Sequence, residues 1–77
     1  RRGRPMTPVV TVVVNGRPAE LPAGSTLAGA LAALGWDPGG AGIAVAVNGE
    51  VVPRRAWPAT ALGEADRVEV LGATQGG

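Results

Sequence analysis

The sequence contains neither cysteine nor histidine. Without cysteine the chain has no disulfide and no thiolate metal ligand, and without histidine it lacks the commonest metal ligand and the usual general base. The remaining side chains offer no recognisable pair of nucleophile and base. An enzyme is therefore the least expected class of protein, and we predict no catalytic residue and no metal site.

Charge and long apolar segments are also scarce. The 77 residues carry seven arginines, no lysine and six acidic residues, for a net charge of +1. Three of the arginines lie in Arg1–Arg4, which leaves four against six acids in the rest of the chain. A nucleic acid is therefore not an expected partner. Because no apolar run reaches the length of a membrane span or a signal-peptide core, we expect a cytoplasmic protein without a membrane partner.

This length allows one small domain. We expect the domain at 6–72, between a disordered extension or tag remnant at 1–5 and a flexible tail at 73–77. The leading residues have no periodicity of their own, and Met6 stands where a natural start would lie. A basic docking arm is the less favoured interpretation of the first five residues.

Two Asn-Gly dipeptides, Asn15-Gly16 and Asn48-Gly49, predict tight hairpin turns because both turn residues can take positive φ. We assign both pairs to turn geometry only. Pro18, in the return strand of the first hairpin, indicates the edge of a sheet. The strands that the two turns join are expected at 9–14, 17–21, 43–47 and 50–52.

A helix is predicted between the two hairpins. Ser25 or Thr26 can cap its start, and Gly35 suits the left-handed position that ends it. Three leucines recur at the spacing of one helical face: Leu27, Leu31 and Leu34. An irregular segment around Trp57 and a last alternating strand at 67–71 follow the second hairpin.

The order hairpin, helix, hairpin, excursion and strand is that of the β-grasp, or ubiquitin-like, fold of the α+β class. A mixed sheet of about five strands with one helix packed across it buries the apolar side of both. The last strand, inserted centrally, would run parallel to the first. The expected core consists of Val12, Val14, Leu21, Leu27, Leu31, Leu34, Val45, Val47, Val68 and Val70.

The sequence ends in Gly76-Gly77. A carboxylate becomes a useful electrophile only after its oxygen is made a leaving group, which adenylation does. Glycines suit a tail that must enter a narrow active site because they lack a Cβ and allow close backbone approach. On a bare dipeptide a flexible or vector-derived end would be the better interpretation, but after the last strand of a β-grasp domain we favour a functional end.

Two internal segments resemble the thiamine-biosynthesis sulfur carriers of the ThiS family. Residues 45–57 contain the pattern V-N-x-x-x-V-P-R-x-x-W, and residues 62–70 are similar to the family's L-x-x-G-D-x-V-E-V segment. The ending Gly76-Gly77 matches as well. Ala65 departs from the pattern, since the family usually has glycine there, so the geometry of this local turn is left open.

The resemblance implies a carrier rather than an enzyme. A ThiF-type enzyme would use ATP to adenylate Gly77, a cysteine desulfurase would supply sulfur, and the thiocarboxylate would serve the thiazole synthase ThiG. The carrier itself would bind no cofactor, and Gly76 would be the threading neighbour of Gly77. The alternatives are a molybdopterin-type carrier, which the V-P-R-x-x-W pattern disfavours, a ubiquitin-like modifier and a plain interaction domain.

Three further positions are candidates for docking a partner: Arg54, Trp57 and Leu71. For Trp57 we favour a structural role in folding the excursion back onto the sheet, and for Arg54 an ion pair with a nearby acid. Leu71 and Val13 both alternate outward from core positions. We expect these two to form an exposed apolar patch on the free face of the sheet.

Overall fold

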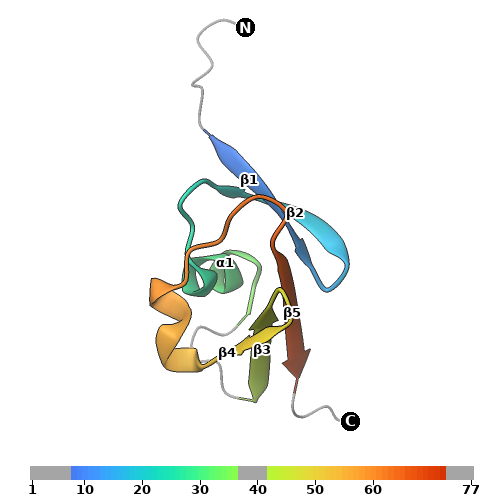
Figure 1. Cartoon of the computed structure of the whole chain (residues 1–77), viewed down its shortest axis with the longest axis vertical. Helices are drawn as coiled ribbons and strands as arrows, with labels where there is room; N and C mark the ends of the chain where they lie inside the picture. The colour runs from blue at the N-terminus through green and yellow to red at the C-terminus, as the bar shows by residue number, and fades with distance from the viewer. Residues whose placement is uncertain (1–7, 37–41, 73–77) are drawn as a thin grey trace, which may run out of the picture.

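The computed structural model describes residues 8–36 and 42–72 (Figure 1). Expectations for 1–5 and for the tail with Gly76 and Gly77 fall outside the described residues. Within them, the elements in chain order are β1 Val9–Val14, β2 Arg17–Pro22, α1 Leu27–Ala33, β3 Ile43–Val47, β4 Glu50–Val52, the 3-10 helix η1 Arg54–Ala59 and β5 Arg67–Gly72.

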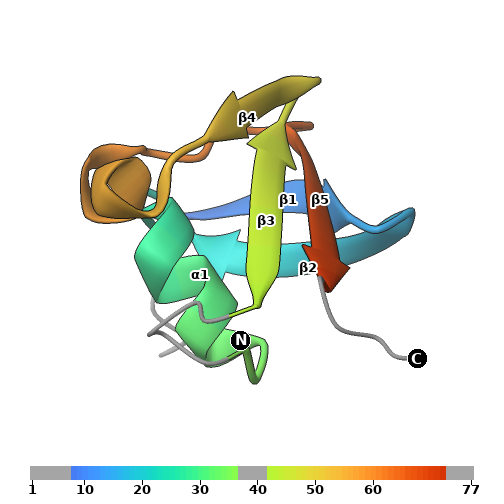
Figure 2. The same ribbon diagram turned by 90° about the horizontal axis from the view of Figure 1, so that it is seen from below.

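The five strands form one mixed sheet in the order β2-β1-β5-β3-β4. The last strand is central and runs parallel to β1, whereas its other neighbour, β3, is antiparallel. Both views place α1 and η1 on the same side of the sheet (Figures 1 and 2). The predicted β-grasp arrangement and the edge position of β2, with Pro18, are therefore confirmed.

The helix α1 begins as predicted, because the Thr26 hydroxyl accepts a hydrogen bond from the Gly29 N–H at 3.1 Å. It ends at Ala33, and Gly35 follows the C-cap with φ of +93°, the left-handed conformation that was predicted for it. Leu34 is thus the C-cap and is 40% exposed, so its prediction as a core residue was wrong. No helix among the described residues is long and apolar enough to cross a membrane.

The core lies between the sheet and the two helices. Two of the predicted residues, Val14 and Val47, are only partly buried and pack against its margin. Three buried residues were absent from the expected core: Ala30, Trp57 and Leu62. The backbone N–H of Leu62 donates to the carbonyl of Ser25 at 2.9 Å, which ties the segment after η1 to the start of α1. The other buried members are Val12, Leu21, Leu27, Leu31, Val45, Val68 and Val70.

Ala65 lies in the turn that leads into β5, and its φ is +69°. Its backbone N–H donates to the carbonyl of Thr11 at 2.7 Å, so the turn is fixed against β1. A left-handed conformation costs a residue with a Cβ about 1–2 kcal/mol relative to glycine. The turn therefore keeps the geometry that glycine would favour, although alanine occupies the position.

We predict that Ala65→Gly stabilises the protein. Relief of the positive φ outweighs the greater freedom that glycine gives the unfolded chain, for a net gain of about 0.5–1 kcal/mol. Thermal unfolding should show a melting temperature raised by a few degrees. The control is Ala32→Gly, an exposed alanine in α1, which should lower the melting temperature. A lower melting temperature for Ala65→Gly would show that the turn is not strained.

Candidate functional site

The end of β5 is the part of the described fold from which the tail at 73–77 continues. Val68 and Val70 on this strand are buried against the helix side. Leu71, the next residue, is 64% exposed, as the alternation predicted. The strand therefore anchors the core with one set of side chains and presents the other set beside the base of the tail.

Leu71 belongs to a group of apolar side chains on the face of the sheet that α1 does not cover. The strand register places Ala44 of β3 opposite Leu71, and Ala46 of β3 opposite Val51 of β4. Val51 is 75% exposed, the most exposed of the large apolar side chains among the described residues. We call Ala44, Ala46, Val51 and Leu71 the open-face patch. It runs from β5 across β3 to β4.

Val13 is not part of this patch, contrary to the expectation from the sequence. It lies on β1 opposite Arg67, at the start of β5, and is only partly exposed. Leu71 lies four positions after Arg67, about 13 Å further along the strand. Glu69, which is exposed, shares this face with them. Charged side chains therefore lie between Val13 and Leu71, because the parallel register pairs β1 with the beginning of β5 rather than its end.

The structure separates the other two docking candidates from Leu71. Trp57 is buried, and its indole N–H donates to the carbonyl of Val52 at 2.9 Å, which confirms the favoured structural role. Its buried ring leaves little surface for a partner. Arg54 is exposed and begins η1, on the helix side of the sheet (Figure 2). The described fold therefore does not gather these candidates on one surface.

Both hairpin asparagines bind β5 through their side chains. The amide of Asn15 accepts from the Val70 N–H at 2.8 Å and donates to the Val70 carbonyl at 3.3 Å. The amide of Asn48 accepts from the Arg67 N–H at 2.9 Å. Their assignment to turn geometry alone was therefore incomplete. Each has positive φ as predicted, 50° for Asn15 and 52° for Asn48, and each also supports β5.

Asp66, just before β5, receives two hydrogen bonds. The Gly63 N–H donates to its carboxylate at 2.7 Å and the Asn48 amide at 3.0 Å. Both bonds lower the pKa of Asp66 from its ordinary value of 3.8, and the bond from Gly63 has the larger effect. Burial raises the pKa slightly and opposes them. The charged carboxylate thus helps to close the turn that directs the chain into β5.

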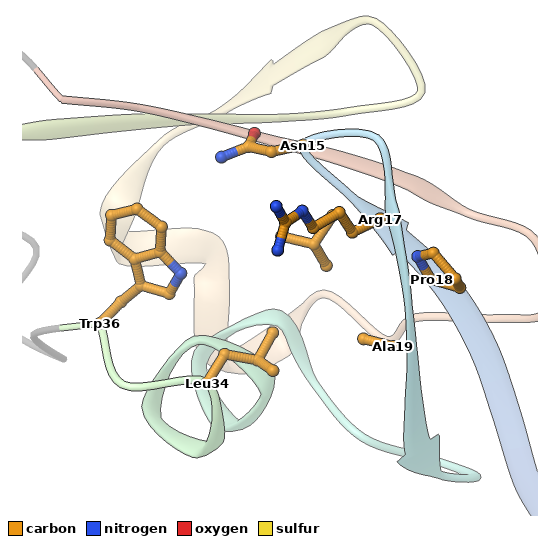
Figure 3. Close-up of a pocket in the computed structure, with 7 residues that line it drawn as sticks. Asn15, Arg17, Pro18, Ala19, Leu34 and Trp36 are labelled. Atoms are coloured by element: carbon orange, nitrogen blue, oxygen red, sulfur yellow. The ribbon is translucent and has the colours of Figure 1, made fainter.

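A hollow of about 480 Å³ lies on the helix side, beside the first hairpin turn (Figure 3). Arg17 and Trp36 face it from β2 and from the segment after α1, and Leu34 forms part of its wall. Its lining residues are Val14, Asn15, Arg17, Pro18, Ala19, Leu34 and Trp36, with no acidic side chain among them. Asn15 therefore connects this hollow with β5.

The described side chains provide surfaces for binding. Among residues 8–36 and 42–72, no three acidic, histidine or cysteine side chains lie close enough together to hold a metal ion. The open-face patch can bind an apolar surface, and β5 can present whatever follows Gly72. This arrangement suits a protein that is acted on at its end while it is held by its sheet.

The comparisons with known proteins agree with one another. Residues 12–77 match the ThiS family. The structure is similar to the crystal structure of a thiamine biosynthesis protein (ThiS) from Geobacter metallireducens, with a TM-score of 0.74 and 31% identity over 88% of this chain and 100% of that chain. An NMR solution structure of a thiamine biosynthesis protein from the same organism gives a TM-score of 0.68 and 31% identity, over 88% of each chain. Curated proteins gave no significant match.

We predict that Asp66→Asn reduces the acid sensitivity of folding. Because the pKa of Asp66 is lower in the folded than in the unfolded protein, its charge stabilises the fold above about pH 4 and this contribution is lost as the pH falls. Urea unfolding at several pH values should show that wild type has a larger free energy of unfolding than Asp66→Asn at neutral pH. This difference should shrink as the pH falls. Glu69→Gln, at an exposed position, controls for the loss of one charge. An advantage that did not change with pH would contradict this role.

Proposed function

The chain belongs to the ThiS family, and we propose that it is a sulfur carrier of thiamine biosynthesis. The observation that carries the proposal is the extent of the family match, which begins at Val12 in β1 and includes Gly76 and Gly77. The match thus covers the folded body together with the tail. The V-P-R-x-x-W pattern around η1 supports the thiamine branch over a molybdopterin-type carrier.

The proposed chemistry takes place at the carboxylate of Gly77. A ThiF-type activating enzyme directs a carboxylate oxygen at the α-phosphorus of ATP, and pyrophosphate leaves. The outer sulfur of a persulfide from the cysteine desulfurase system then attacks the acyl carbon and displaces AMP, which gives an acyl disulfide. A thiol reductant attacks the cysteine sulfur of this disulfide, forms a new disulfide with it and releases the thiocarboxylate that the thiazole synthase ThiG consumes. The carrier contributes the electrophile, while its partners contribute ATP binding and catalysis. Gly76 lets the tail pass through a narrow channel because it has no Cβ.

The open-face patch is the proposed docking surface. A partner that draws the tail into its active site must also hold the domain, and Leu71 lies one residue before the end of β5. The patch is apolar and small, which suits repeated binding and release by successive enzymes. Exposed Glu69 beside it can contribute to orientation at the rim.

We predict that sulfur loading requires the carboxylate at the position of Gly77. Deleting Gly77, or adding one residue after it, should abolish loading without lowering the melting temperature, because the reactive group moves while the packed residues stay the same. Intact-protein mass after incubation with ATP, the activating enzyme and a sulfur source measures the exchange of oxygen for sulfur. Removal of Arg1–Pro5, a change at the opposite end, should leave loading unchanged. A sulfur mass gain in the extended protein would exclude the terminal carboxylate of Gly77 as the site.

We also predict that Leu71→Arg weakens binding to the activating enzyme while it leaves the stability of the fold nearly unchanged. The exposed position should limit the change in unfolding free energy to about 0.5 kcal/mol. Affinity for the activating enzyme should fall by about tenfold or more, because the variant loses apolar contact and places a charge in the interface.

Val9→Arg is the matched control, since Val9 is also an exposed aliphatic residue of a strand but begins β1, at the other end of the sheet from Leu71. Thermal melts and titrations with the activating enzyme and the thiazole synthase compare the three proteins. Unfolding of Leu71→Arg would make Leu71 a structural residue. Wild-type affinity of this variant for both enzymes would place the docking surface elsewhere.

A further inference from the structure

The two asparagines that begin the hairpin turns support β5 at opposite ends. Asn48 binds its start, through the Arg67 N–H and the Asp66 carboxylate. Asn15 binds near its end, through both the N–H and the carbonyl of Val70. Both residues have nearly the same positive φ and both are followed by glycine. They form a natural pair for comparison, because only Asn15 lies near the base of the tail.

The Asn15 side chain continues the pairing with β5 after the backbone of β1 has turned away. The parallel pairing of β1 with β5 ends at Val14 and Val68, and the Asn15 N–H adds one bond to the Val68 carbonyl at 2.9 Å. The chain then turns away at Asn15-Gly16. Val70 is the next residue of β5 whose backbone groups point toward that edge. The Asn15 amide pairs with both groups and so extends the ladder by one step.

The end of β5 is consequently held on two edges. On one side β3 pairs with it as far as Gly72, and on the other side the Asn15 amide pairs with Val70. Figure 3 shows the Asn15 side chain at the rim of the hollow, beside this strand. If the Asn15 amide were removed, the backbone of Val70 would lose both of these partners. Unpaired groups at a strand end favour local opening.

We propose that Asn15 is a positioning residue for sulfur loading: it fixes Leu71 and the base of the tail relative to the rest of the domain. This inference rests on the proposed function. An enzyme that grips the open-face patch finds the base of the tail at a defined position only if β5 stays paired to its end. Small displacements of a reacting group reduce rates strongly, by as much as about 100-fold for 1 Å.

The test compares Asn15→Gly with Asn48→Gly. Both variants keep a Gly-Gly hairpin turn that accepts positive φ, and both lose two side-chain hydrogen bonds to β5 or to the turn before it. Asn15→Asp retains an acceptor for the Val70 N–H and removes the donor, so it should recover part of the effect. It also provides a second variant should Asn15→Gly fold poorly.

Two measurements follow on full-length proteins. In amide hydrogen exchange by NMR, Asn15→Gly should accelerate exchange at Val70 and Leu71 by about tenfold or more, whereas Asn48→Gly should act at Arg67. In sulfur loading, the activating enzyme should turn over Asn15→Gly with a kcat about tenfold lower than for wild type. The KM for the carrier should change less, since Ala44, Ala46 and Val51 still present most of the patch. Asn48→Gly should change kcat by less than about twofold.

Equal losses of kcat in the two glycine variants would show that Asn15 acts only through stability and would overturn the inference. Unchanged exchange at Val70 and Leu71 in Asn15→Gly would overturn it as well, because the strand end would then be held without the amide. If the wild-type protein gained no sulfur at all, the proposed function would fail and the positioning role with it. A loaded wild type with indistinguishable variants would leave the proposed function intact and reject the role of Asn15 alone.

Discussion

The central position of β5 is the constraint on which the whole sheet depends. The two hairpins, β1-β2 and β3-β4, do not pair with each other, and β5 joins them by pairing with β1 on one edge and β3 on the other. A lone two-stranded hairpin is marginally stable in water, whereas a sheet of three or more strands packed on a helix is not. Val68 and Val70 also bring β5 into the core. The pairing of β5 therefore completes the sheet.

The same strand is the stem from which 73–77 continue, so stability and presentation of the tail are linked through one element. Any group that pairs with the end of β5 contributes to both. Asn15, Asn48 and the turn with Asp66 each bind β5 or the residues just before it. Under the proposed function, the position of its end is what the carrier contributes to the chemistry.

Local signals in the sequence were sufficient to predict most of the fold. The Asn-Gly turns, the Thr26 cap and the alternation in β5 each depend on residues close in sequence, and the structure has all of them. Leu34 was misassigned because its spacing places it on the leucine face, whereas it is the C-cap just before Gly35 and stays exposed. Val13 was misassigned because the register of a parallel pair depends on residues more than fifty positions apart.

The role of the two asparagines was missed for the same reason. Asn15 reaches Val70 across 55 positions, and its turn propensity already gave a complete local explanation. The open-face patch was predicted only at Leu71, because its other members follow from the pairing of β5 with β3 and of β3 with β4. The described structure does not extend to Gly76 and Gly77, so their role still rests on the family pattern.

The edges of the sheet explain why a partner should use its face. In a two-residue hairpin Val14 pairs with Arg17 through hydrogen bonds, so Pro18, Glu20 and Pro22 direct their backbone outward. Two of these three have no N–H, and β2 is therefore a poor template for another strand. At the other edge β4 has only three residues and is followed by Pro53. With both edges blunted, the open face carrying Leu71 and Val51 is the apolar surface of the sheet that a partner can reach without adding a strand.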